Sequence, residues 1–345
     1  MYQNTVKTWV NALKIAAVQE ARHKLIPIVR RTPLACSRTI SEILGRKVYF
    51  KYENLQRTGS FKIRGAYYKM CGLNCTERGV VAASAGNHAQ GVALAAAEHG
   101  LTATVVMPKQ APRSKIQATM GYGARVILAG QNYDEAYAEA SRIAQESGAT
   151  FIPAFDDADI IAGQGTIGFE ILEDLPDVDL VLVPVGGGGL ISGIGLVAKT
   201  LKPDVRVIGV TTVSAPAALL SRHRGELQEV PVGRTLADGI AIKRPGKLPL
   251  EMMQRYVDDI VAVEEESIAK SLLFLLSRTK TLVEGAGAVG LAALLSDKVR
   301  DPATKTVIVL SGGNIDATTI ARIIVGRKQA AVGKGLHIWR RSFLH

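Results

Sequence analysis

The sequence predicts an α/β protein built from two open, mostly parallel, twisted sheets with helices on both faces. Its 345 residues suffice for about two domains. Runs rich in Val, Ile and Leu alternate with helical patterns and glycine turns along the chain, which is the pattern of consecutive β-α-β units. Glycine-rich or polar loops follow three of these runs, at residues 84–88, 186–189 and 311–314.

The strands expected in the first half are short apolar or β-branched runs. They cover residues 48–52, 79–83, 103–107, 124–128 and 150–152. Helical patterns separate the later ones, over residues 91–98, 114–120 and 133–146.

The strands expected in the second half are almost entirely apolar and cover residues 180–185, 205–210 and 306–310. Strands that are buried on both faces are typical of parallel sheets. Such sheets bind ligands beyond the carboxyl ends of their strands. We therefore expect the three loops Ser84–His88, Gly186–Gly189 and Ser311–Asn314 to meet in one site.

The formal net charge is +11, from 42 basic and 31 acidic residues. A basic surface could bind nucleic acid or an anionic membrane. However, the basic residues are scattered, and aromatic residues make up only 5% of the chain, which is few for the stacking platforms of single-strand binders. We therefore expect a soluble enzyme whose positive field attracts an anionic cofactor and substrate, with no nucleic-acid or membrane partner. One basic cluster is expected to lie in a solvated tail over residues 326–345: Arg327, Lys328, Lys334, Arg340 and Arg341.

The three cysteines are too few for a disulfide framework, so we expect a reduced, cytoplasmic protein. Cys71 and Cys75 would share a helix face, but no further metal ligands lie near them, and structural thiols are expected. The first residues carry Lys7, Lys14 and Glu20 among apolar ones, unlike a signal peptide. No stretch reaches the ~18 to 20 apolar residues of a membrane span.

The tetraglycine Gly186–Gly189 follows a buried strand and precedes an apolar helical stretch. Successive glycines can point several N–H groups at one anion, and a helix N-terminus adds partial positive charge, so the loop is expected to cradle a phosphate. The dinucleotide pattern G-x-G-x-x-G fails because Ile191, or Ser192 one register later, occupies its last position. The alternative is a tight turn that needs glycine for packing alone.

Lys62 stands between Phe61 and Ile63 at the start of a helical pattern. A lysine in a dry site has a lowered amine pKa and can form an imine with an aldehyde. The alternative is a solvated surface charge.

The run Lys51–Ala66 closely resembles the cofactor-lysine segment of threonine dehydratases, which belong to the tryptophan-synthase-β-like family of pyridoxal-phosphate enzymes. Ser84–Gly91 is similar to the substrate-carboxylate loop of that family, Pro184–Leu190 to its phosphate loop, and Ser311–Asn314 to its pyridine-nitrogen loop. Two further similar stretches lie at residues 238–241 and 283–288.

The resemblance implies the tryptophan-synthase-β-like fold, with pyridoxal 5′-phosphate in a cleft between a large domain (residues 1–53 and 154–325) and a small domain (residues 54–153). Lys62 would carry the cofactor as an imine and move the α-proton of the substrate. The other implied cofactor contacts are Phe61 on the ring face, Asn87 on the 3′-oxygen, the backbone N–H groups of Gly186, Gly187, Gly188, Gly189 and Leu190 on the phosphate, and Ser311 on the pyridine nitrogen. The implied contacts to the substrate carboxylate are Ser84, Gly86, Asn87 and His88.

The implied reaction is the dehydration and deamination of L-threonine to 2-oxobutanoate and ammonia, and of L-serine to pyruvate, by a short, catabolic-like homo-oligomer (dimer or tetramer). A hydroxyl at Ser311 cannot carry the charge of a carboxylate beside the ring nitrogen, so the electron sink is weaker and prompt loss of a β-hydroxyl is favoured. A serine racemase or a dehydratase of another β-hydroxy amino acid is the alternative. Racemases commonly carry a second serine where this chain has Ala85, and metal-binding relatives carry Glu where it has Thr211, so no metal is expected.

Overall fold

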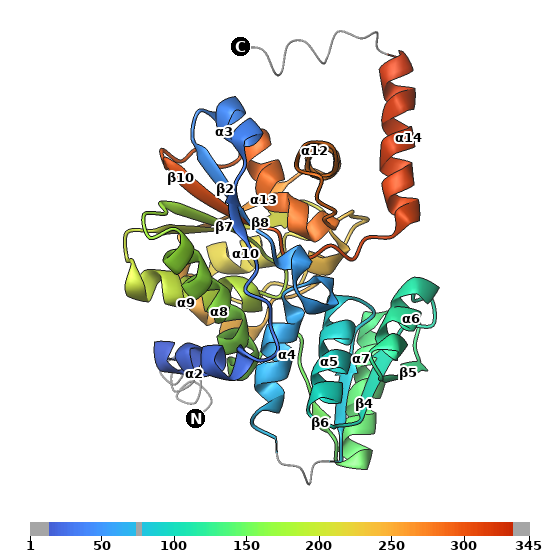
Figure 1. Ribbon diagram of the computed structural model, residues 1–345. Helices are drawn as coiled ribbons and strands as arrows, with labels where there is room; N and C mark the ends of the chain where they lie inside the picture. Colours follow the sequence, from blue (N-terminus) through green and yellow to red (C-terminus); the bar gives the residue numbers. More distant parts are fainter. Residues whose placement is uncertain (1–13, 74–77, 334–345) are drawn as a thin grey trace.

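The computed structural model describes residues 14–73 and 78–333, and these residues form two sheets (Figure 1). The six-stranded sheet has the order β1-β2-β10-β7-β8-β9, and the four-stranded sheet has the order β5-β4-β3-β6. All neighbouring strands are parallel except β1 and β2. The strands are β1 (Leu34–Cys36), β2 (Lys47–Lys51), β3 (Val80–Ala83), β4 (Ala103–Met107), β5 (Arg125–Leu128), β6 (Thr150–Phe151), β7 (Leu180–Pro184), β8 (Arg206–Thr212), β9 (Asp259–Val263) and β10 (Lys305–Val309). The predicted architecture of two open, mostly parallel sheets is confirmed.

Helices cover both sheets and connect their strands. The α-helices are α2 (Ile15–Leu25), α3 (Arg38–Leu44), α4 (Lys62–Met70), α5 (Asn87–Glu98), α6 (Arg113–Gly121), α7 (Tyr133–Ser147), α8 (Ala158–Asp174), α9 (Gly189–Leu201), α10 (Ala217–Arg224), α11 (Lys247–Tyr256), α12 (Glu265–Phe274), α13 (Gly285–Leu295) and α14 (Ala317–Gly333). Short 3-10 turns form η1 (Glu53–Leu55), η2 (Arg57–Gly59) and η3 (Asp238–Ile240). In Figure 1 the four-stranded sheet with α5, α6 and α7 makes one lobe, the six-stranded sheet makes the other, and α4 runs between them. The domain limits at residues 53/54 and 153/154 stay a prediction.

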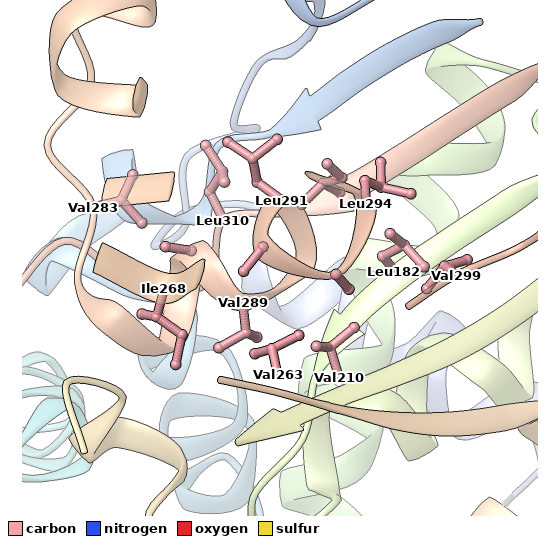
Figure 2. Packing of buried hydrophobic residues seen from close by; sticks show 14 of the residues in the cluster. Leu182, Val210, Val263, Ile268, Val283, Val289, Leu291, Leu294, Val299 and Leu310 are labelled. Atoms are coloured by element: carbon pink, nitrogen blue, oxygen red, sulfur yellow. The ribbon is translucent and has the colours of Figure 1, made fainter. Parts of the chain in front are cut away.

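The core of the six-stranded sheet lies between its strands and α13, as Figure 2 shows. Val210 of β8 and Val263 of β9 lie beside Val289 of α13, whereas Leu182 of β7 lies nearer Leu294, and all five side chains are buried. Glycines in α13 let the helix approach the sheet closely. A Cβ added at Gly290 would lie 2.7 Å from the side chain of Ile308 in β10. This packing fixes the carboxyl ends of the central strands, where the site lies.

Every strand that the sequence predicts is found, with ends that differ by at most two residues. Two strands were not predicted, β1 and β9. Both lie at the edges of the six-stranded sheet and are partly exposed. β1 has three residues, which is too short for a recognisable strand pattern, and the apolar run of β9, Ile260–Val263, is only four residues long.

Part of the predicted tail is helical, because α14 continues to Gly333. Lys334, Arg340 and Arg341 of the basic cluster lie outside the described residues, as do Lys7 and Cys75. Within the part of the chain that the structure describes, none of the helices combines the length and the apolar character that a membrane crossing requires.

Four charged side chains form a buried network between the lobes. Arg64 of α4 contacts Glu53 at 2.8 Å and Glu170 of α8 at 2.6 Å, and Lys51 of β2 contacts Glu170 at 2.5 Å. Arg64, Lys51 and Glu53 are fully buried. Two cations and two carboxylates balance in charge, so the network ties α4 to α8 and to the end of β2 without a net buried charge.

The substitution Arg64→Met is expected to lower the free energy of unfolding by about 3–5 kcal/mol, because it leaves the carboxylates of Glu53 and Glu170 buried with fewer partners. Urea unfolding followed by circular dichroism measures the loss. The control is Arg142→Met, because Arg142 also contacts two carboxylates, but on the exposed surface of α7, where such pairs contribute about 0–1 kcal/mol. Similar losses in the two variants would contradict the role of burial.

Candidate active site

The segment before α4 docks on the carboxyl end of β10. Ser60 forms an antiparallel bridge with Gly312, and the N–H of Phe61 donates to the carbonyl oxygen of Ser311 at 3.2 Å. The next residue is Lys62, the first residue of α4. The structure therefore brings the predicted lysine segment and the predicted Ser311–Asn314 loop into direct contact, although about 250 residues separate them in the sequence.

The amine of Lys62 lies in a largely apolar setting. Its Nζ donates to the carbonyl oxygen of Ala154 at 2.8 Å and lies 5.2 Å from the centre of the Phe61 ring. Burial lowers the pKa of the Lys62 amine to about 8, against an opposing attraction from the carboxylate of Glu284. A neutral amine is therefore accessible near neutral pH, which the chemistry of a nucleophile or base requires.

The tetraglycine Gly186–Gly189 connects β7 to α9, and Gly188 has a φ of 94°. A Cβ at Gly187 would lie 2.2 Å from the ring of Phe155, and one at Gly188 would lie 2.8 Å from Pro249. Packing alone therefore demands glycine at these positions. A second observation concerns the backbone: among the described residues, no hydrogen-bond acceptor is found for the amides of Gly186, Gly187 and Gly188. With the N-terminus of α9, these free donors form an anion-binding cradle, and Leu190 in the first turn of α9 is buried.

The loop after β3 carries Ser84, Ala85 and Gly86 and leads into α5, which begins at Asn87. The hydroxyl of Ser84 accepts the N–H of Gly86 at 3.1 Å. These loop residues are half-buried. The first backbone amides of a helix have no acceptor within it and attract anions, so the loop is suited to a carboxylate.

The side chain of His88 is buried away from such an anion. Its Nε2 lies 2.9 Å from the carbonyl oxygen of Ile152 and must donate to it, because a carbonyl only accepts. Burial, followed by repulsion from Lys62, lowers the pKa of His88 to about 3, so the ring is neutral. The remaining ring nitrogen has no proton to donate. If His88 contributes to carboxylate binding, it does so through its backbone N–H at the start of α5.

Asn87 bonds to two residues to which the sequence had assigned no role. Its Nδ2 donates to Glu284 Oε1 at 2.6 Å, and its Oδ1 accepts from Asn314 Nδ2 at 2.7 Å. Burial, followed by repulsion from the nearby Asp238, raises the pKa of Glu284 to about 7. The signal in the sequence was an acidic residue inside the apolar stretch 283–288.

Ser311 lies directly beyond β10 and is 2% exposed. Its backbone carbonyl accepts from Phe61. The nearby hydroxyl of Ser60 is buried and has no hydrogen-bond partner among the described residues.

A cavity of about 650 Å³ adjoins the site and reaches Glu284 and Asn314. Residues of both lobes line it. Lys115 of α6 contacts Asp238 of η3 at 2.7 Å across the cleft. Glu284 and Asn314 line this cavity, whereas Lys62, the tetraglycine and Ser311 are not part of its lining.

The structure thus brings the predicted residues together: a lysine amine with a lowered pKa, an anion cradle, a carboxylate loop and the buried Ser311. These groups fit a cofactor that carries an aldehyde and a phosphate, and a substrate that carries a carboxylate.

Comparisons with known proteins agree with this chemistry. Residues 25–312 match the family model described as pyridoxal-phosphate dependent enzyme. The L-threonine ammonia-lyase of Thermotoga maritima is 56% identical over 95% of this chain and 81% of its own length, and the catabolic L-threonine dehydratase TdcB of Escherichia coli K12 is 48% identical over 88% of this chain and 94% of its own. The structure of maize serine racemase matches with a TM-score of 0.87 at 34% identity, over 93% of this chain and 99% of that chain. The resemblance found in the sequence is confirmed.

The neutral buried state of His88 makes the stability of the fold depend on pH. Below the ordinary histidine pKa of 6.5, the unfolded chain binds a proton that the folded chain excludes down to about pH 3. This contribution is present above pH 6.5 and falls by about 2 kcal/mol by pH 5. The variant His88→Gln keeps a donor for the carbonyl oxygen of Ile152 but has no imidazole to protonate. Between pH 6.5 and pH 5, its free energy of unfolding should therefore fall by about 2 kcal/mol less than that of the wild type. Urea titrations at both pH values measure it, with the exposed His223→Gln as control, and equal falls in wild type and His88→Gln would contradict the assignment.

Proposed function

The chain belongs to the family of pyridoxal-phosphate-dependent enzymes, and on this premise we propose that it is an L-threonine ammonia-lyase that forms 2-oxobutanoate and ammonia. The similarity to threonine ammonia-lyases along almost the whole chain carries this proposal. Activity on L-serine, which would yield pyruvate, is proposed from the same chemistry.

The residues of the site fit the cofactor. The free amides of Gly186–Gly189 and Leu190 would hold its phosphate, and Lys62 Nζ would carry its aldehyde carbon. The hydroxyl of Ser311, a residue that is 2% exposed, would face the pyridine nitrogen, and Phe61 would cover the ring. The remaining N–H of Asn87 would reach the 3′-oxygen. Bound pyridoxal phosphate supplies the electron sink that makes the α-hydrogen of an amino acid acidic.

The side chains and backbone of this protein would then position the substrate and move its proton. The amides at the start of α5, with the loop Ser84–Asn87 and the backbone N–H of His88, would bind the substrate carboxylate. Lys62 would remove the α-proton, since an amine with a pKa of about 8 is partly neutral at physiological pH. The β-hydroxyl leaves as water, and the addition of water to the resulting imino acid releases ammonia.

Elimination is favoured over racemisation by the loop after β3. Racemisation needs a proton donor on the face of the substrate opposite the lysine. The residue next to Ser84 is Ala85, whose methyl group offers no proton. A serine racemase is the second candidate because the maize enzyme of that name has a closely similar structure.

We also propose a cytoplasmic homo-oligomer, a dimer or tetramer, whose small domain spans residues 54–153. The thiols of Cys36 and Cys71 are free, which fits a reducing compartment.

Borohydride reduction of the cofactor-loaded protein, followed by peptide mapping, should recover pyridoxyl-lysine at residue 62. The variant Lys62→Ala should lose at least about 10³-fold in oxo-acid release from threonine, because one amine serves as both cofactor anchor and base. The control is Lys298→Ala, an exposed lysine outside the site, which should keep wild-type activity. Label at another lysine, or an active Lys62→Ala protein, would refute the assignment. The same oxo-acid assay with L-serine tests the second substrate.

Incubation of the wild type with L-serine should give pyruvate and little D-serine by chiral chromatography. The variant Ala85→Ser places a hydroxyl beside Ser84 and should raise the ratio of racemisation to elimination about tenfold or more. Rapid formation of D-serine by the wild type would favour the racemase instead.

A further inference from the structure

A chain of hydrogen bonds crosses the site from η2 to α13. The amide of Asn314 donates from Nδ2 to the carbonyl oxygen of Thr58 at 2.8 Å and to Asn87 Oδ1 at 2.7 Å. Asn87 in turn donates from Nδ2 to Glu284 Oε1 at 2.6 Å. Both ends of this chain of hydrogen bonds are acceptors, because neither a backbone carbonyl nor an ionised carboxylate can donate. The direction of both amides follows from their two partners.

The hydrogen bonds leave Asn87 with one uncommitted donor. Its amide has two N–H groups and one oxygen. The oxygen is engaged by Asn314, and one N–H is engaged by Glu284. One N–H remains. A rotation of the amide by 180° would set its oxygen against the carboxylate and its nitrogen against the NH₂ group of Asn314, so that both bonds would be lost.

We infer that Glu284 and Asn314 are positioning residues, which hold the amide of Asn87 in the one orientation that offers an N–H to an oxygen acceptor of the bound cofactor. This inference rests on the proposed function and deepens it, since it concerns the same cofactor. Glu284 and Asn314 act through Asn87 and do not themselves carry out the reaction.

At the other end of this chain of hydrogen bonds, the backbone of Thr58 and Gly59 is strained. Thr58 has a φ of 63°, in the left-handed region that non-glycine residues avoid. Gly59 follows with a φ of 69°, and a Cβ there would lie 2.6 Å from Asn314 Oδ1. The N–H of Gly313 holds the turn by donating to the carbonyl oxygen of Gly59 at 2.9 Å. Strain that persists in a site signals a function, and here it directs the Thr58 carbonyl at Asn314.

Gly312 leaves the space in which Glu284 meets Asn87. Glu284 is 4% exposed, and a Cβ at Gly312 would lie 2.6 Å from Glu284 Oε1 and 3.0 Å from Asn87 Nδ2. The charged groups that face it are Asp238, Lys115 and Lys62. The pKa of Glu284 is raised to about 7. Above that pH the carboxylate is ionised and can only accept the hydrogen bond from Asn87. Below it, the carboxyl group also carries a hydroxyl donor and fixes Asn87 less firmly.

A double-mutant cycle tests whether Glu284 acts through Asn87. The dissociation constant of pyridoxal phosphate is measured by absorbance for wild type, Glu284→Ala, Asn87→Ala and the double variant. Glu284→Ala should weaken binding about 3- to 10-fold in the wild-type background and leave it unchanged in the Asn87→Ala background. An equal loss in both backgrounds, or no loss in either, overturns the inference. Should Glu284→Ala fail to fold by circular dichroism, Asn314→Ala replaces it in the same cycle, with the same outcomes.

The variant Glu284→Gln separates positioning from charge. Its side-chain oxygen can still accept from Asn87, so it should bind pyridoxal phosphate within about twofold of wild type, a change well below the worth of one hydrogen bond. In wild type, the visible absorbance of the bound cofactor should change with pH, with a midpoint near pH 7. In Glu284→Gln this pH-dependent change should be absent. The control Glu264→Gln, at the N-terminus of α12, should keep it, and a titration that survives in Glu284→Gln overturns the role of Glu284. A wild type that binds no pyridoxal phosphate would instead refute the proposed function itself.

Discussion

The site depends on the docking of the segment before α4 against the carboxyl end of β10. The backbone N–H of Asn54 donates to Leu310, that of Phe61 donates to Ser311, and Ser60 bridges Gly312. These contacts fix the backbone just before Lys62, and the hydrogen bond of its amine to the carbonyl oxygen of Ala154 fixes the end of its side chain. The other groups of the site are the anion cradle after β7, the loop after β3 and the hydroxyl after β10. The sheet order brings β7 and β10 together as neighbours.

A second constraint is the crossover from the four-stranded sheet to α8. The carbonyl of Ile152 receives the ring N–H of His88, that of Ala154 receives the amine of Lys62, and Phe155 packs under Gly187. A single segment therefore contacts the carboxylate loop, the lysine and the phosphate cradle. Because it connects the two lobes, a shift of one lobe against the other would change all three contacts at once. The buried network around Arg64, in the first turn of α4, opposes such a shift.

Sequence reasoning predicted the central strands and the three loops, because buried parallel strands and glycine turns have local patterns. The loops were expected along one sheet edge, but the loop after β3 belongs to the four-stranded sheet and the other two to the six-stranded sheet. The short edge strands β1 and β9 were not predicted, nor was the orientation of His88, which depends on a carbonyl far along the chain. Glu284 was missed as a site residue for the same reason: its partner Asn87 lies 197 residues away. A hydrogen bond of this kind has no periodic signature, whereas a glycine run that must accommodate an anion does.

The same withdrawal from water shifts the two titratable groups of the site in opposite directions. It lowers the pKa of the Lys62 amine to about 8 and raises that of the Glu284 carboxyl to about 7, since burial disfavours the charged form of each. The attraction of Glu284 limits the shift of Lys62, and the hydrogen bond from Asn87 and the attraction of Lys115 limit the shift of Glu284. Near neutral pH, each group can therefore exist in either protonation state at low energetic cost, whereas in water both would be almost fully charged. Such a site can accept and return protons without a strong acid or base. Elimination has this requirement, because a proton leaves the α-carbon, water departs and the amine must end the cycle free to act again.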